Sequence, residues 1–155
     1  MMKQEPSPPK KCMRSAASSA EGPAGMVLGF LLARAGVDIV VLEKHADFLR
    51  DFRGDTIHPS TLEIMYELGL LDDFLKRPHQ ELRELAGQIG DDRVALADFS
   101  HLPTHCRFIA FMPQWDFLDF LADEAQAYPS FSLRMQAEVT DLVQDRDAVV
   151  GVRAR

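Results

Sequence analysis

The sequence has little cysteine and no long apolar run, and each shortage excludes a class of protein. Its 155 residues include two cysteines, Cys12 and Cys106, which lie far apart and outside any Cys-x-x-Cys spacing. This pattern excludes a disulfide framework and does not suggest a metal site, so we expect a reduced, cytoplasmic protein. The longest apolar run, residues 26–33, is far shorter than the roughly 20 residues that span a bilayer. We therefore expect no membrane partner.

Positive charge is also scarce. Against 24 acidic residues the chain has 17 Lys and Arg, which gives a formal net charge of −7. Such a protein has no basic field to attract nucleic acid, so no nucleic-acid partner is expected. Residues 1–19 hold three prolines and four serines but few large apolar side chains. That composition predicts a disordered tail over 1–19, and the remaining residues, 20–155, are enough for one domain with its own core.

A helix followed directly by a buried strand is the first ordered pattern in the chain. Apolar residues recur on one helical face from Ala24 to Arg34, at Met26, Val27, Phe30 and Leu31, and Gly36 is a typical C-terminal stop. The β-branched run 37–44 is typical of a strand covered on both faces in a parallel sheet. Helix and strand together predict the second half of a βαβ unit, and hence an α/β fold.

The rest of the chain alternates helical and strand patterns. A helical segment over 59–77 starts with Ser60-x-x-Glu63, which matches a capping box, and is broken at Gly69. Strands are predicted over 88–99 and 106–113, followed by an amphipathic helix over 114–128 with Phe117, Leu118, Leu121 and Ala125 inward. Two further strands are predicted over 131–145 and 148–155.

A glycine-containing loop precedes the first helix. Ala20-Glu21-Gly22-Pro23-Ala24-Gly25 has the register of a dinucleotide-binding loop in which alanine replaces the first glycine. Pro23 suits the first helical turn, whose N–H groups face the phosphates of a bound dinucleotide. Gly29, one turn later, allows the helix to lie close on the sheet. The loop predicts a nucleotide site at Gly22, Pro23, Ala24 and Gly25.

Glu43 supports this interpretation because it ends the following strand, 18 residues after Gly25. A carboxylate there can accept hydrogen bonds from ribose hydroxyls, and Lys44 beside it is included in the expected site. The alternative is that the glycines serve turns and Glu43 is a solvated strand end. The stretch before the loop, CMRSAASS, is too polar for a central buried strand. We therefore expect the first strand to be lost or altered.

Three separated segments carry a family resemblance: EGPAGMVLGFLLARAGVDIVVLEK, RGDTIHPSTLEIMYELGLLDDF and MPQWDFLDFLADEA. They resemble the FAD-dependent aromatic-ring hydroxylases, the p-hydroxybenzoate hydroxylase-like flavoprotein monooxygenases, in order over residues 21–155. The resemblance implies an incomplete Rossmann-like FAD-binding βαβ fold with strands from the start of the substrate domain. Residues 20–155 would then be a partial FAD-binding domain, the N-terminal fragment of a longer enzyme.

The resemblance also implies site residues. Glu43 would bind the adenosine ribose, and Arg53, with Gly54, Asp55 and Thr56, would run beside the flavin and pyrophosphate. Gln114 would contact the cofactor, and Val139 would offer a backbone contact to adenine. The residue types alone are less specific. Arg53 has a donor fork suited to phosphate, but it could be an exposed loop arginine, and Gln114 could satisfy backbone groups at a helix start.

The implied activity is oxidation of an aromatic small molecule, with NAD(P)H as reductant of FAD and one oxygen atom transferred to the ring. The sequence identifies no catalytic residue. His58, His101 and His105 have no Ser, Cys or carboxylate partner at a telling spacing, so we interpret them as loop histidines.

Two alternatives stay open: a non-catalytic remnant or partner-dependent module, and an NAD-binding Rossmann module of the dehydrogenase kind. Even as the FAD-binding portion of a monooxygenase, the chain is expected to be inactive alone.

Overall fold

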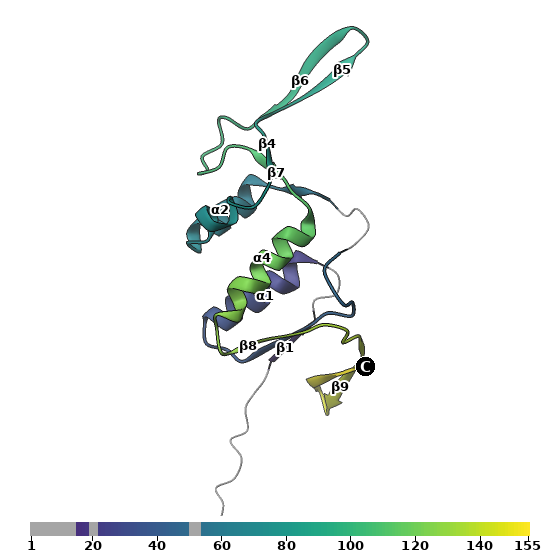
Figure 1. The fold of residues 1–155 in the computed structure, drawn as a ribbon. Coiled ribbons are helices and arrows are strands. Elements are labelled where there is room, and N and C mark those ends of the chain that lie inside the picture. Colours follow the sequence, from purple (N-terminus) through teal and green to yellow (C-terminus); the bar gives the residue numbers. More distant parts are fainter. Residues whose placement is uncertain (1–14, 19–21, 50–53) are drawn as a thin grey trace, which may run out of the picture. The chain divides into compact units, whose positions relative to one another are not determined.

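A computed structural model describes residues 15–18, 22–49 and 54–155 (Figure 1), and for 15–18 it describes the backbone alone. The chain divides into two compact units. Unit 1 comprises residues 1–47 and 121–155, and unit 2 comprises residues 48–120.

Unit 1 is built on a parallel three-stranded sheet. Its strands lie in the order β1 (Ser15–Ser18), β2 (Ile39–Leu42) and β8 (Phe131–Arg134). Helix α1 (Pro23–Arg34) connects β1 to β2. Two neighbouring parallel strands joined through a helix form a βαβ unit, so the expected Rossmann-like α/β fold is confirmed.

Strand β1 corrects one expectation and agrees with another. Ser15–Ser18 were assigned to a disordered tail, and the strand before the loop was expected to be lost or altered. These four residues instead pair with β2 in parallel, from Ser15 opposite Ile39 to Ser18 opposite Leu42. The ladder is made by main-chain groups, so small and polar residues can form it without large apolar side chains. Residues 1–14 and 19, the remainder of the expected tail, lie outside the described residues.

Helix α1 packs on the sheet through a stripe of Met26, Gly29, Phe30 and Ala33, all buried. This i, i+3, i+4, i+7 stripe differs from the expected face, because Leu31 is exposed and Val27 is only half-buried. The stripe centres on Gly29, where an added Cβ would lie 2.5 Å from Cγ2 of Val41 in β2. The close approach expected at Gly29 is therefore confirmed. The helix stops at Gly36 as expected, with φ +76°.

The remaining strands of unit 1 form an antiparallel hairpin, β9 (Val139–Asp145) and β10 (Ala148–Ala154). The sequence predicts one strand over 131–145, but this stretch divides into β8 and β9. The break falls at Gln136, whose φ of 54° is left-handed. A strand cannot continue through that conformation, and glutamine gives no sequence signal for it.

Unit 2 contains a short antiparallel sheet and the helices that follow its first strand. The sheet order is β3 (Thr56–Ile57), β7 (Ile109–Phe111) and β4 (Gln80–Leu82). Helices α2 (Pro59–Glu67) and α3 (Leu71–Phe74) are separated at Gly69, as expected, where φ is +76°. Helix α4 (Gln114–Gln126) begins in unit 2, where the rings of Phe74 and Phe117 meet edge to face at 5.6 Å. The four inward residues expected on α4 are all buried.

Strands β5 (Glu84–Ile89) and β6 (Asp92–Asp98) form a two-stranded ribbon that extends away from β4 and β7 (Figure 1). The single strand expected over 88–99 is wrong. Gly90 has φ +64°, and the chain turns there between Ile89 and Asp92. A lone glycine within a strand-like run is a weak turn signal, which is why the pattern alone does not reveal the hairpin.

The expected capping box at Ser60 and Glu63 is also wrong. Helix α2 starts at Pro59, with His58 and not Ser60 at its N-cap, and it has no side-chain cap. Ser60 therefore lies inside the first turn. Glu63 instead accepts hydrogen bonds from the loop residue His105.

Candidate cofactor site

The expected ADP-side residues gather at one edge of the unit 1 sheet. Helix α1 starts after the carboxyl end of β1, Glu43 follows the carboxyl end of β2, and residues 135–139 follow the carboxyl end of β8. Because the three strands are parallel, these ends lie along the same edge. In open α/β sheets this edge is where ligands bind.

The start of α1 can accept an anion. Gly22 precedes it in extended conformation (φ 177°, ψ 172°), and a Cβ added there would meet nothing within 4 Å. Pro23, Ala24 and Gly25 form the first turn. This turn contains no acidic residue, and no side chain of the described residues caps it. Its N–H groups and the helix dipole therefore suit a pyrophosphate, as the loop predicted.

Glu43 is the one polar residue among the buried side chains described, with 2% of its surface exposed. Its Oε1 accepts a hydrogen bond of 3.0 Å from the main-chain N–H of His45. A carboxylate buried at a strand end and oriented by the backbone is not a solvated strand end, so that alternative is wrong. The expected position of Glu43, at the end of β2, is confirmed.

A second loop at this edge is held against the end of β2. The N–H of Glu43 donates to the carbonyl of Arg134, and the N–H of Ala137 donates to the carbonyl of Glu43 at 2.8 Å. The N–H of Gln136 donates to the carbonyl of His45. The left-handed conformation of Gln136 directs the chain into this arrangement. Residues 135–137 and His45 could not be predicted as part of this edge, because nothing in their residue types marks them.

Lys44 and Val139 complete the ADP-side set. Lys44 is exposed beside Glu43, and Val139 is half-buried at the start of β9, opposite Ala154 of β10. Both therefore lie in unit 1 on segments that leave the carboxyl edge. Their contacts with a cofactor stay predictions.

The segment 54–56 and Gln114, which are expected on the flavin side, fall within unit 2. Arg53 lies outside the described residues, but Gly54 follows with φ +101°, a conformation that favours glycine. The N–H of Met112 donates to the carbonyl of Asp55 at 2.9 Å, just before Gln114 begins α4. Unit 2 therefore brings the 54–56 segment next to the 112–114 segment, although more than 50 residues separate them in sequence. The role of Gln114 stays a prediction.

His105 has a carboxylate partner that spacing did not reveal. Its main-chain N–H and its ring Nδ1 each lie 2.9 Å from a carboxylate oxygen of Glu63, 42 residues earlier. The ring of Tyr66, one turn along α2, stacks on the imidazole with 3.3 Å between centroids. His105 thus lies in a loop, as interpreted, and it has a carboxylate partner that is distant in the sequence. The pair anchors the loop before β7 to α2.

This anchor predicts a pH-dependent contribution to stability. Hydrogen bonds from the main chain and ring of His105 hold the pKa of Glu63 below its ordinary value of 4.5. A lowered carboxyl pKa stabilises the fold above the ordinary pKa, and this stabilisation is lost as the pH falls through the folded value. We expect Glu63→Gln to lower the free energy of unfolding at about pH 6, with the difference from wild type shrinking below about pH 4.

The measurement is urea unfolding followed by circular dichroism across that pH range. Glu67→Gln, an exposed change on the same helix, is the matched control. The free energy of unfolding of Glu63→Gln is compared with that of wild type at each pH. If the difference is constant with pH, the ionised carboxylate is not what holds the loop.

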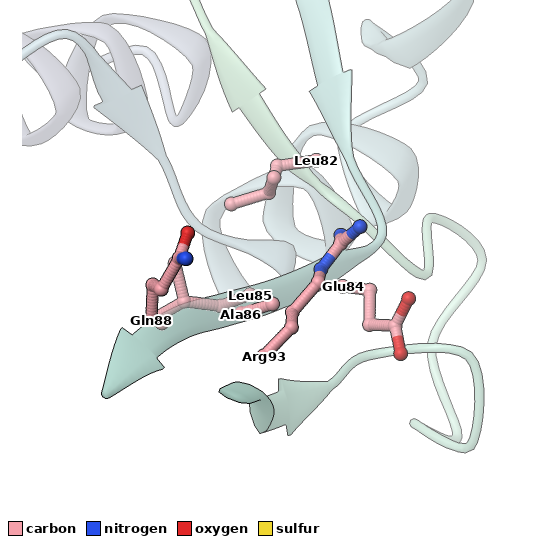
Figure 2. Close-up of a pocket in the computed structure, with 7 residues that line it drawn as sticks. Leu82, Glu84, Leu85, Ala86, Gln88 and Arg93 are labelled. Atoms are coloured by element: carbon pink, nitrogen blue, oxygen red, sulfur yellow. The ribbon is translucent and has the colours of Figure 1, made fainter. Parts of the chain in front are cut away.

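Other candidate features lie elsewhere or fall short. A cavity of about 430 Å³ runs along β5 in unit 2, and none of the expected cofactor residues lines it (Figure 2). Among the described residues, no group of three or more His, Cys, Asp or Glu could hold a metal ion. No helix in the described part of the chain is long and apolar enough to cross a membrane.

Comparisons with known proteins agree with this geometry. The chain is 26% identical over 131 residues to 6-methylpretetramide 4-monooxygenase of Streptomyces rimosus, which covers 84% of this chain and 31% of the relative. It is 31% identical over 130 residues to rifampicin monooxygenase of Streptomyces venezuelae, covering 83% of this chain and 26% of the relative. The chain thus spans less than a third of the length of these relatives.

A solved structure shares the fold. The p-nitrophenol 4-monooxygenase of Pseudomonas putida superposes with a TM-score of 0.76 at 24% identity, over 92% of this chain and 38% of that one. The sequence profile of the FAD binding domain matches residues 21–155. The resemblance to flavin-dependent monooxygenases is therefore confirmed, and the chain belongs to the FAD binding domain family.

Proposed function

We propose that the chain binds the ADP half of FAD at the carboxyl edge of the unit 1 sheet. The observation that carries this proposal is the Glu43 carboxylate, buried and oriented by the N–H of His45 at the same edge as the uncapped start of α1. The N–H groups of the α1 turn would bind the pyrophosphate and Glu43 the ribose hydroxyls. Lys44 would flank the ribose, and the backbone of Val139 would meet adenine.

Arg53 and Gln114 are proposed to contact the flavin half of the cofactor. In this proposal Arg53 would offer its fixed donor fork to the pyrophosphate or to a carbonyl of the flavin. Gln114 would contact the cofactor from the start of α4. The hydrogen bond between Met112 and Asp55 supports this grouping, because it places the segment that follows Arg53 beside the segment that precedes Gln114.

The reaction we propose for the whole protein is hydroxylation of an aromatic small molecule, with NAD(P)H as reductant. Two observations support it: the family, and relatives whose names describe monooxygenases. Bound FAD would supply the redox chemistry, while the residues of this chain hold and orient the cofactor. The cytoplasmic location and the absence of a nucleic-acid partner stay predictions.

Selective cofactor binding tests the proposal against the NAD-module alternative. FAD and NAD share an ADP half, so both can use Glu43 and the α1 turn, but only FAD has a flavin that Arg53 and Gln114 could contact. We expect isothermal titration to give a dissociation constant at least about tenfold lower for FAD than for NAD, a difference of roughly 1.4 kcal/mol. Equal or tighter binding of NAD would favour the dehydrogenase-like module.

The chain by itself is expected not to hydroxylate. Oxygen transfer needs a flavin ring enclosed from water, and the chain spans less than a third of the relatives' length. The test is NAD(P)H oxidation with product analysis after adding FAD and an aromatic substrate such as p-nitrophenol. Hydroxylated product above the free-flavin background would contradict this expectation. FAD bound without product would distinguish a cofactor-binding portion from a remnant that binds nothing.

A further inference from the structure

Gln136 has a backbone conformation that its residue type does not favour. Its φ of 54° lies in the left-handed region, which glycine adopts freely and other residues adopt rarely. In the described part of the chain the one other non-glycine residue with a positive φ is Arg146, at the turn between β9 and β10. Such a conformation persists only where the surrounding structure holds it, and it is concentrated at functional sites. The hydrogen bonds around Gln136 show what holds it here.

Gln136 is one residue too many for a regular ladder between β2 and β8. In a parallel ladder, the N–H and C=O of one residue bond to residues two positions apart on the neighbouring strand. The N–H of Glu43 donates to the carbonyl of Arg134, so in a regular ladder the carbonyl of Glu43 would accept from Gln136. It accepts instead from the N–H of Ala137, at 2.8 Å. Gln136 is therefore an inserted residue, a bulge in the ladder.

The displaced N–H of Gln136 has a partner of its own. It donates to the carbonyl of His45 at 2.9 Å, and the N–H of His45 donates to Oε1 of Glu43 at 3.0 Å. The bulge thus holds both ends of segment 43–45, because Ala137 binds the carbonyl of Glu43 and Gln136 binds that of His45. Between these two bonds lies the N–H group that orients the buried carboxylate.

The chain is also held after the bulge. The main-chain N–H groups of Glu138 and Arg155 each donate to the carbonyl of the other at 3.0 Å, and their side chains form an ion pair at 2.8 Å. Val139, the residue proposed to meet adenine, follows directly. Residues 135–137 therefore connect two hydrogen-bonded segments, and the conformation of Gln136 determines where the N–H groups of this short loop point.

We propose that Gln136 is a positioning residue for the ribose site and acts through its backbone. Its left-handed bulge holds segment 43–45, and this keeps the Glu43 carboxylate in one orientation before a cofactor arrives. The inference rests on the proposed role of Glu43 as the ribose acceptor. A site that is oriented in advance binds more tightly, because less order has to be created on binding. The side chain of Gln136 is exposed, which is why the main chain is assigned the role.

Substitutions at Gln136 separate its conformation from its side chain. Gln136→Gly removes the side chain but adopts the left-handed region freely, so the dissociation constant for FAD should stay within about twofold of wild type. Gln136→Val has a β-branched side chain that opposes a positive φ, so the dissociation constant should rise about tenfold. Arg146→Val is the matched control, because Arg146 has a φ of 56° at the other end of β9. This control should leave the dissociation constant unaltered.

A double-mutant cycle shows whether Gln136 acts through Glu43. In a Glu43→Ala background, Gln136→Val should change the dissociation constant for FAD by less than about threefold, because the carboxylate that it positions is absent. The same tenfold effect in both backgrounds would overturn the proposal. If Glu43→Ala leaves FAD binding unchanged, the proposed function fails too. If Glu43→Ala weakens binding and Gln136→Val does not, the positioning role alone is refuted.

Amide hydrogen exchange tests the same geometry without a cofactor. The N–H of His45 bonds to the carboxylate, so its exchange rate reports whether Glu43 keeps its orientation. This amide should exchange about tenfold faster in Gln136→Val than in wild type or Gln136→Gly, while the amides of α1 keep their rates. Unchanged protection of His45 in Gln136→Val would contradict the proposal. An equal loss of protection throughout α1 would show a general structural role and would also overturn it.

Discussion

Gly29→Val is expected to lower the free energy of unfolding by about 3 kcal/mol or more, the upper range for overpacking a core. Helix α1 meets β2 at this residue, and an added Cβ would lie 2.5 Å from Val41 Cγ2 and 3.4 Å from a ring carbon of Phe131. Both neighbours are buried strand residues that cannot move without disturbing the sheet. The gain in helix propensity from replacing glycine is smaller than about 1 kcal/mol and cannot offset the clash.

Urea unfolding followed by circular dichroism measures the change. Gly151→Ala is the matched control, because its Cβ would meet Val143 at an ordinary 4.0 Å and its φ is not left-handed. That variant should stay within about 0.5 kcal/mol of wild type. The double variant Gly29→Ala/Val41→Ala should lose less stability than the sum of its single changes, since the clashing methyl group is gone. Tolerance of Gly29→Val would mean that α1 does not lie this close to β2.

Glu43→Ala is expected to weaken FAD binding by about 1–3 kcal/mol, or roughly 5- to 150-fold in the dissociation constant. The substitution removes the acceptor proposed for the ribose hydroxyls and leaves the N–H of His45 without its 3.0 Å partner. Glu43→Gln keeps an oxygen acceptor and should lose less. Fluorescence titration with FAD measures both variants.

Two comparisons separate a binding role of Glu43 from a structural one. Glu67→Ala, an exposed change in unit 2, should leave the dissociation constant unaltered. The unfolding midpoint of each Glu43 variant shows whether unit 1 itself has been weakened. An unchanged dissociation constant in folded Glu43→Ala would remove this residue from the site.

Local signals in the sequence were sufficient to predict the structure at the centre of unit 1. Proline at a helix start, glycine at its end and a β-branched run ending in a carboxylate each act within a few residues, so α1, Gly36, β2 and Glu43 could be predicted. The close packing at Gly29 could also be predicted from the sequence. Glycine one turn into a helix that covers a sheet has a definite steric reason.

What the sequence did not reveal depends on partners distant in the chain. Strand β1 exists through main-chain pairing with β2, 24 residues later, and its side chains give no strand signal. Glu63 satisfies the spacing of a capping box, yet it binds His105, which is 42 residues away. The loop at Gln136 depends on a left-handed glutamine, a conformation for which the residue type gives no warning.

The most direct test of the central claim, that unit 1 holds the ADP half of FAD, is competitive isothermal titration of the wild-type chain. FAD should bind with one site per chain, and ADP should displace it, because both use the α1 turn and Glu43. FMN, which lacks the adenosine half, should compete at least about tenfold more weakly, a difference of roughly 1.4 kcal/mol. Displacement of FAD by FMN but not by ADP would contradict the account.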